Sequence, residues 1–148
     1  MLAEGTKAPD FSLPDAEGVK VSLSDYATKK VLLVFYPGDD TPVCTTQLCS
    51  YRDNFSEFSK RDIQVLGIST DTVESHKKFA EKHELPFPLL SDHDKNVSRQ
   101  YDAIDFLGMS KRAYVLVDEQ GVIRLSFNDL LPLFYQSTRD LFAKIDAM

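Results

Sequence analysis

Two cysteines lie five positions apart, shortly after the longest apolar run of the chain, residues 31–36. They are Cys44 and Cys49, and the chain has no other cysteine. Cys44 lies where an expected strand passes through a proline-containing turn into an expected helix. There a thiol faces unpaired backbone N–H groups and the positive end of a helix dipole, which favour the nucleophilic thiolate. With Cys49 a little over one turn further on, the pair predicts a nucleophile and its resolving partner, and so a redox enzyme.

The residues around Cys44 resemble the active-site signature of the peroxiredoxins. Pro37, Thr41 and Cys44 match the pattern P-x-x-x-T-x-x-C. The wider stretch FYP-x-D-D-T-P-x-C-T, with the five-residue step to Cys49, resembles the branch that comprises the bacterioferritin comigratory protein and peroxiredoxin Q. The resemblance runs from residue 5 to about Phe127 and fades beyond it. It implies a thioredoxin-like α/β fold with a central mixed sheet flanked by helices and an N-terminal β-hairpin.

The resemblance also implies a reaction. It suggests an atypical 2-Cys peroxiredoxin, a thiol-dependent peroxidase that reduces hydrogen peroxide and organic hydroperoxides. Cys44 would be the peroxidatic residue, which attacks a peroxide oxygen and becomes a sulfenic acid. Cys49 would be the resolving residue, which closes an intramolecular disulfide with it. A thioredoxin-type reductant would then restore both thiols, and no metal or other cofactor is expected.

Three further groups are expected to act near the Cys44 thiolate. The Thr41 hydroxyl would accept a hydrogen bond from the peroxide and donate toward the sulfur, which would orient both reactants. Pro37, with its fixed φ and missing N–H, would shape and shield the pocket. The backbone N–H groups of Val43 and Cys44 would bind a peroxide oxygen as the O–O bond breaks.

A fixed cation is also expected beside the thiolate, and arginine suits this role because it stays charged. The family places its arginine directly before the strand of the late hairpin, which here indicates Arg112. Arg52, eight residues after Cys44 on the expected helix, ranks second. The remaining arginines are Arg61, Arg99 and Arg124.

Two other functions remain open at this point. A protein thiol–disulfide oxidoreductase on the same fold would normally carry C-x-x-C, whereas four residues separate these cysteines. Insulin reduction, compared with peroxide consumption, would distinguish the two enzymes. A non-catalytic binding module would have an unreactive Cys44, since buried free cysteines are commonly inert.

The histidines do not predict a metal site. His76 and His83 lie seven positions apart on an expected helix, and His93 lies in an expected loop. None pairs with a cysteine at the short spacings of zinc sites. Asp39 and Asp40 are expected to be a solvated loop pair, and Tyr114, Phe127 and Phe134 are expected to be core residues.

Length and charge limit the remaining possibilities. A chain of 148 residues suits a single domain, 1–148, that needs no disulfide to fold. Its net charge of −6 gives no basic surface for nucleic acid. No apolar run is long enough to cross a membrane, and the first residues lack the pattern of a secretory signal. The expectation is a cytosolic protein, as a monomer or weak homodimer.

Apolar periodicity and turn residues predict alternating strands and helices. The terminal helix should place Leu141 and Ile145 on one face. Strands are expected at 11–13, 19–23, 31–36, 63–69, 89–90, 113–117 and 122–127, and helices at 45–61, 72–83, 94–101 and 136–147, with a helical turn at 24–26.

Overall fold

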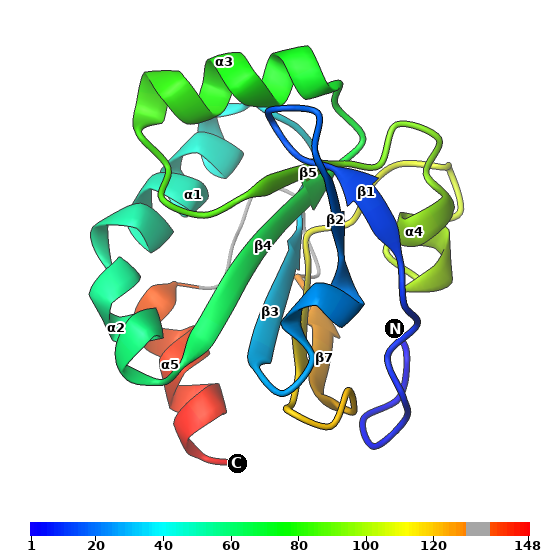
Figure 1. Ribbon diagram of the computed structural model, residues 1–148, viewed down its shortest axis with the longest axis vertical. Helices are drawn as coiled ribbons and strands as arrows, with labels where there is room; N and C mark the ends of the chain where they lie inside the picture. Colours follow the sequence, from blue (N-terminus) through cyan, green and yellow to red (C-terminus); the bar gives the residue numbers. More distant parts are fainter. Residues whose placement is uncertain (130–136) are drawn as a thin grey trace.

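The computed structural model describes residues 1–129 and 137–148, and a five-stranded mixed sheet lies at its centre (Figure 1). The strand order is β5-β4-β3-β6-β7, in which β3, β4 and β5 run parallel while β6 and β7 are antiparallel to their neighbours. The strands are β3 (Lys30–Phe35), β4 (Ile63–Ser69), β5 (Leu89–Ser91), β6 (Ala113–Val117) and β7 (Ile123–Asn128).

A separate hairpin precedes the sheet. Strands β1 (Ser12–Pro14) and β2 (Lys20–Ser22) pair antiparallel, and the 3-10 turn η1 (Leu23–Tyr26) follows. The hairpin, the helical turn and the mixed sheet confirm those parts of the sequence prediction.

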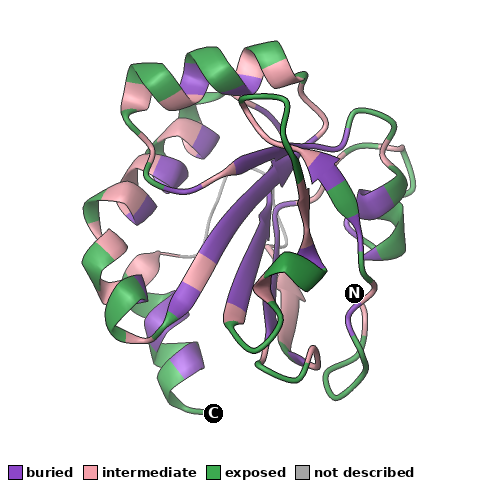
Figure 2. Ribbon diagram, in the orientation of Figure 1, coloured by how far each residue is buried: buried purple, intermediate pink, exposed green. Residues whose placement is uncertain are grey.

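Both faces of the sheet are covered by apolar contacts. Leu33 and Phe35 of β3 pack with Val97 of α4 on one face, while Leu32 and Val34 pack in a second cluster that includes residues of α1, α2, α3 and α5. The central strands are accordingly buried along most of their length (Figure 2). The helices are α1 (Pro42–Asp53), α2 (Phe55–Lys60), α3 (Val73–His83), α4 (Asn96–Gln100) and α5 (Thr138–Asp146).

The helix that carries both cysteines differs from its predicted bounds. It begins at Pro42 rather than residue 45, because proline suits the first helical position and Thr41 takes the extended backbone of an N-cap. It ends at Asp53, where the Asn54 side chain donates to the carbonyl of Ser50 at 2.8 Å and competes with helix continuation. The single predicted helix is therefore two.

The terminal helix is close to its prediction. It begins at Thr138, with the Ser137 side chain as its N-cap, and it buries Leu141 and Ile145. Residue 136, where the prediction began, and Phe134 lie outside the described residues. In the described ranges, no helix has both the length and the apolar character needed to cross a membrane.

Candidate active site

Cys44 lies at the start of α1, as its third residue. Its side chain is fully buried, and both Cys44 and Cys49 are free thiols. Helix geometry leaves the N–H groups of Val43 and Cys44 without acceptors inside the helix. The Thr41 side chain does not cap them either. Cys44 therefore sits at a helix N-terminus whose first donors are not satisfied by the cap.

Thr41 has a different orientation from the predicted one. Its hydroxyl donates to the carbonyl of Gly38 at 3.1 Å, and not toward the sulfur of Cys44. The hydroxyl proton is thereby engaged, while the oxygen retains lone pairs that can accept a hydrogen bond. The predicted role of Thr41 toward the peroxide and the sulfur stays a prediction. Pro37, which is partly buried, begins the same turn.

Arg112 reaches the cysteine from the neighbouring strand. Phe35 pairs with Ala113 in the β3–β6 register, which places Arg112 beside the end of β3 where the turn to Cys44 begins. The Nη1 atom of Arg112 donates to Cys44 Sγ at 3.2 Å, and the arginine is 3% exposed. The sequence analysis thus identified an arginine that contacts Cys44.

A buried hydrogen-bond network holds Arg112 in place, and this network was not predicted from the sequence. Arg112 Nη1 also donates to Oε1 of Gln47 at 2.5 Å. The Nε2 atom of Gln47 in turn donates to the hydroxyls of Tyr51 and Tyr114, and Tyr114 donates to Asp129. One feature of the sequence could have indicated Gln47: it lies three residues after Cys44, so the two side chains are neighbours on the helix surface.

Burial raises the pKa of Tyr51 well above its ordinary value, an effect that outweighs its hydrogen bonds with Gln47 and Tyr114. Its phenol therefore remains neutral and able to donate. Tyr114 and Phe127 were expected in the core; Tyr114 is buried, and Phe127 is partly buried and stacks on it.

Arg52, the second-ranked arginine, makes its hydrogen bonds away from Cys44. It donates to Asp53 at 3.0 Å and to the carbonyl of His83 at 2.7 Å. These contacts direct its guanidinium toward α3, whereas Arg112 faces the sulfur of Cys44. Cys49 lies further along the same helix and is partly exposed.

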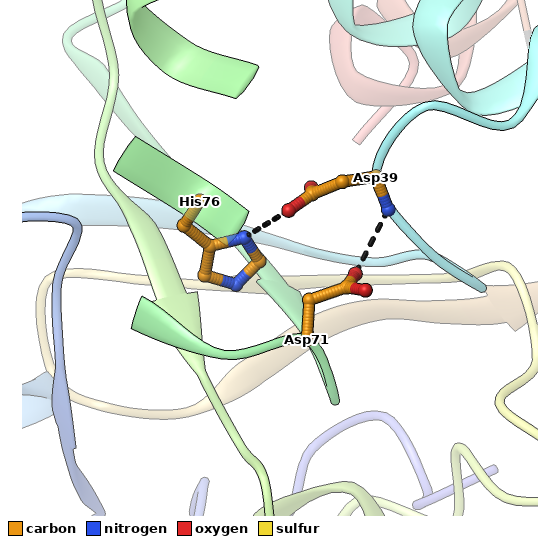
Figure 3. Close-up of side chains that lie close together, drawn as sticks. All are labelled: Asp39, Asp71 and His76. Carbon is orange, nitrogen blue, oxygen red and sulfur yellow. Dashed lines mark hydrogen bonds and ion pairs between the residues drawn. The ribbon is translucent and has the colours of Figure 1, made fainter. Parts of the chain in front are cut away.

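The environment of Asp39 differs from the solvated loop predicted for Asp39 and Asp40. Asp39 is not part of a solvated pair, because its side chain is 1% exposed and lies 2.8 Å from Nδ1 of His76 (Figure 3). Asp40 is exposed. Asp39, Asp71 and His76 also place potential metal-ligating atoms within 4.8 Å of one another. No local pattern predicts that Asp39 meets Asp71 and His76, because Asp39 is more than thirty positions from either of them.

Known proteins resemble the chain over most of its length. A model of the AhpC/TSA family matches residues 5–126. The putative peroxiredoxin bcp of Coxiella burnetii is 46% identical over 127 residues, which cover 80% of this chain and 83% of that protein. The chloroplastic peroxiredoxin Q of Sedum lineare is 44% identical over 131 residues, 86% of this chain and 70% of that protein. Further plant peroxiredoxin Q proteins are longer, and the chain spans 60% or 61% of their length.

A solved structure extends the likeness to the fold. It belongs to a study of the alkyl peroxide reduction activity of the Xanthomonas campestris bacterioferritin comigratory protein. The two chains superpose with a TM-score of 0.82 at 27% identity, over 93% of this chain and 90% of that one. The chain therefore belongs to the AhpC/TSA family: it is a peroxiredoxin of the bacterioferritin comigratory protein and peroxiredoxin Q branch, a thiol-dependent peroxidase with a thioredoxin-like fold.

Proposed function

We propose that Cys44 is the peroxidatic residue of this peroxidase and that Cys49 resolves it. The observation that carries the proposal is the 3.2 Å contact between Arg112 Nη1 and Cys44 Sγ at the start of α1. A buried thiolate in this position has a cation and helix N–H groups to compensate its charge. An inert core cysteine would have no need of an arginine whose guanidinium is buried beside it.

In the first step, the Cys44 thiolate attacks one peroxide oxygen. An S–O bond forms, the O–O bond breaks, and the sulfur is oxidised by two electrons to a sulfenic acid. The other oxygen leaves, with a proton, as water or as an alcohol. Arg112 and the N–H groups of Val43 and Cys44 stabilise the negative charge that develops on the peroxide.

Thr41 and Pro37 position the substrate in this proposal. Because the Thr41 hydroxyl donates its hydrogen bond to the Gly38 carbonyl, its oxygen is oriented to accept a hydrogen bond from the O–H of the peroxide. Pro37, at the other end of the turn, presents no backbone N–H and excludes water from the pocket.

In the second step, the Cys49 sulfur attacks the sulfenic sulfur of Cys44. An S–S bond forms and the sulfenic oxygen leaves as water. A thioredoxin-type dithiol then reduces the disulfide by thiol–disulfide exchange. Hydrogen peroxide and organic hydroperoxides are the proposed substrates, and the named activity of the Xanthomonas protein toward alkyl peroxides supports the second class.

A cytosolic site of action belongs to the same proposal. A catalytic dithiol needs a compartment whose reductants return it to the thiol state. A monomer or weak homodimer is the proposed assembly, because both reacting thiols come from one helix of one chain.

The Cys49→Ser variant tests the resolving role. It should consume about one equivalent of peroxide and stop at the Cys44 sulfenic acid, which dimedone traps. Thioredoxin-linked turnover should fall to background, because no disulfide is formed for thioredoxin to reduce. Turnover through thioredoxin at the wild-type rate would remove Cys49 from the mechanism.

Disulfide formation requires the first turns of α1 to open. Residues five apart in an α-helix have Cα atoms roughly 8.6 Å apart, from a rise of ~7.5 Å and a rotation of ~140°. A disulfide needs about 4.4–6.8 Å between Cα atoms. Because Cys44 and Cys49 both lie within α1, they cannot bond while this segment remains helical. Opening would also remove Cys44 from Arg112 and expose the disulfide to its reductant.

Hydrogen exchange on the reduced and oxidised protein measures this opening. Amides from Thr45 to Tyr51 should lose protection on oxidation, whereas those of β3 and β4 should keep it. Equal protection of the 45–51 amides in both forms, with the disulfide confirmed by mass, would contradict the proposed unwinding.

A further inference from the structure

A buried polar cluster joins the turn between β3 and α1 to helix α3 (Figure 3). Nδ1 of His76 lies 2.8 Å from Oδ2 of Asp39, and the two side chains are 0% and 1% exposed. The same carboxylate accepts hydrogen bonds from the hydroxyls of Tyr36 at 2.7 Å and Ser75 at 2.8 Å. The backbone N–H of Asp39 donates to Asp71 at 2.8 Å. Four contacts therefore converge on Asp39, from Tyr36, Asp71, Ser75 and His76.

The His76 ring joins α3 to two other parts of the chain. Nε2 lies 3.0 Å from the carbonyl oxygen of Leu90 in β5. Nδ1 lies 2.8 Å from the Asp39 carboxylate, which accepts a hydrogen bond from an Nδ1–H.

The neighbouring groups are consistent with hydrogen bonds to an Asp39 carboxylate. Burial alone would raise the pKa of Asp39, but its interactions with His76 and the hydrogen bonds from Tyr36 and Ser75 bring that pKa below its ordinary value. Burial, reinforced by the charge of Asp39, raises the pKa of Tyr36 well above its ordinary value, so its hydroxyl stays neutral and donates. Asp71, on the connection from β4 to α3, is the other acidic group beside the pair.

A metal ion is a poorer occupant of this cluster than the hydrogen bonds already there. Nε2 of His76 is used by Leu90 and Nδ1 by Asp39. Oδ2 of Asp71 accepts from the Ser69 hydroxyl and from the backbone N–H of Asp39. A cation would have to displace these hydrogen bonds, and a metal-binding histidine nitrogen must be free of its proton. The cluster is better described as a set of bonds that fixes the turn.

The turn in question leads directly to the reacting cysteine. Asp40 follows Asp39 with a φ of 60°, in the left-handed region that residues other than glycine rarely adopt. Thr41, the N-cap of α1, comes next and bonds back to Gly38. Such a conformation persists only where its surroundings hold it. The bonds to Asp39 supply that restraint on the N-terminal side of Asp40, and the start of α1 supplies it on the other.

We propose that His76 is a positioning residue for the reaction with peroxide: its ring holds the Asp39 carboxylate and thereby fixes the turn that places Thr41 as the N-cap of α1. His76 contacts the sulfur of Cys44 in none of the described interactions and acts through Asp39. This role rests on the proposed function of Cys44. It means that the rate of the reaction with peroxide depends on a residue of α3, which lies outside the first turn of α1 where Cys44 reacts.

Two variants of His76 separate this role from a merely structural one. His76→Asn retains an N–H donor near the position of Nδ1, toward Asp39, whereas His76→Gln retains one near Nε2, toward Leu90. The Gln variant should slow oxidation of Cys44 by hydrogen peroxide by about one to two orders of magnitude, the effect of a misplaced reacting group. The Asn variant should remain within about threefold of the wild type. Stopped-flow measurement of the second-order rate, beside the melting temperature of each variant, gives the comparison.

The next chemical step provides a control inside the same experiment. Closure of the Cys44–Cys49 disulfide needs the first turns of α1 to open, and a looser turn before α1 does not oppose that, so the Gln variant should close the disulfide at least as fast as the wild type. A Gln variant that reacts with peroxide at the wild-type rate would overturn the proposal. So would equal slowing by Asn and Gln in step with equal losses of melting temperature. If wild-type Cys44 itself does not react with peroxide, the proposed function fails instead.

A measurement on the unmodified protein keeps the test independent of folding in the variants. Nitrogen-15 NMR of the His76 ring should show a proton on Nδ1, the nitrogen that faces Asp39. An Nδ1 without a proton would overturn the proposal.

Discussion

Replacing Cys44 with serine should abolish peroxide reduction and leave the protein folded. A serine hydroxyl is far less acidic than a thiol and is a weak nucleophile without an adjacent base. The substitution exchanges one buried atom for a smaller one, and Arg112 can still donate to the new oxygen. We expect peroxide consumption at the rate of the solution without protein, with a melting transition that remains cooperative.

The matched control for this variant is Cys49→Ser, which makes the same chemical change five positions along the same helix. It should retain the first, stoichiometric reaction with peroxide that Cys44→Ser loses. Catalytic turnover in Cys44→Ser, measured by peroxide consumption with a dithiol reductant, would rule out the assignment of the nucleophile.

Replacing Arg112 with alanine should have the second-largest effect. The guanidinium is buried and donates to Cys44 Sγ at 3.2 Å, and its loss leaves both the Cys44 sulfur and the Oε1 atom of Gln47 without that donor. Removing one donor that stabilises developing charge typically costs about two to three orders of magnitude in rate. We expect a loss of that size in the second-order reaction of Cys44 with hydrogen peroxide.

Two further substitutions make the Arg112 result interpretable. Arg112→Lys keeps a positive charge but not the fixed fork of donors, and it should recover only part of the rate. Arg52→Ala removes an arginine that bonds to Asp53 and the His83 carbonyl, and it should react at the wild-type rate. A large loss in Arg52→Ala with none in Arg112→Ala would transfer the role to Arg52.

The sequence predicted the strands of the sheet well because their signals are local. Continuous apolar runs at β3, β4 and β6 identify strands that are buried on both faces. The start of α1 was missed by three residues, although Pro42 is a favourable first helical residue and Thr41 a favourable cap. The break at Asn54 depends on a side-chain hydrogen bond, which periodicity does not reveal.

The active site was predicted in part. Cys44 and Thr41 lie within one short motif, so their proximity follows from the sequence. Arg112 is 68 positions from Cys44, and its contact depends on the register between β3 and β6. Resemblance to the family supplied that residue; composition and periodicity alone would have left five arginines open.

The supporting shell could not be predicted from local patterns. Gln47 and Tyr114 meet only because α1 packs against the sheet at the start of β6. The pairing of Asp39 with His76 likewise depends on how α3 returns over the turn after β3. Polar residues in such networks look like ordinary loop or surface residues in the sequence, since their partners lie far away along the chain.

The central claim is that Cys44 reduces peroxide and passes its oxidation to Cys49, and intact-mass analysis of the protein after one equivalent of hydrogen peroxide tests it most directly. The wild type should lose the mass of two hydrogen atoms, as one intramolecular disulfide forms, and a dithiol should restore the original mass. The Cys49→Ser variant should gain the mass of one oxygen instead. An unchanged wild-type mass, or a gain of oxygen in Cys44→Ser equal to that in Cys49→Ser, would contradict the account.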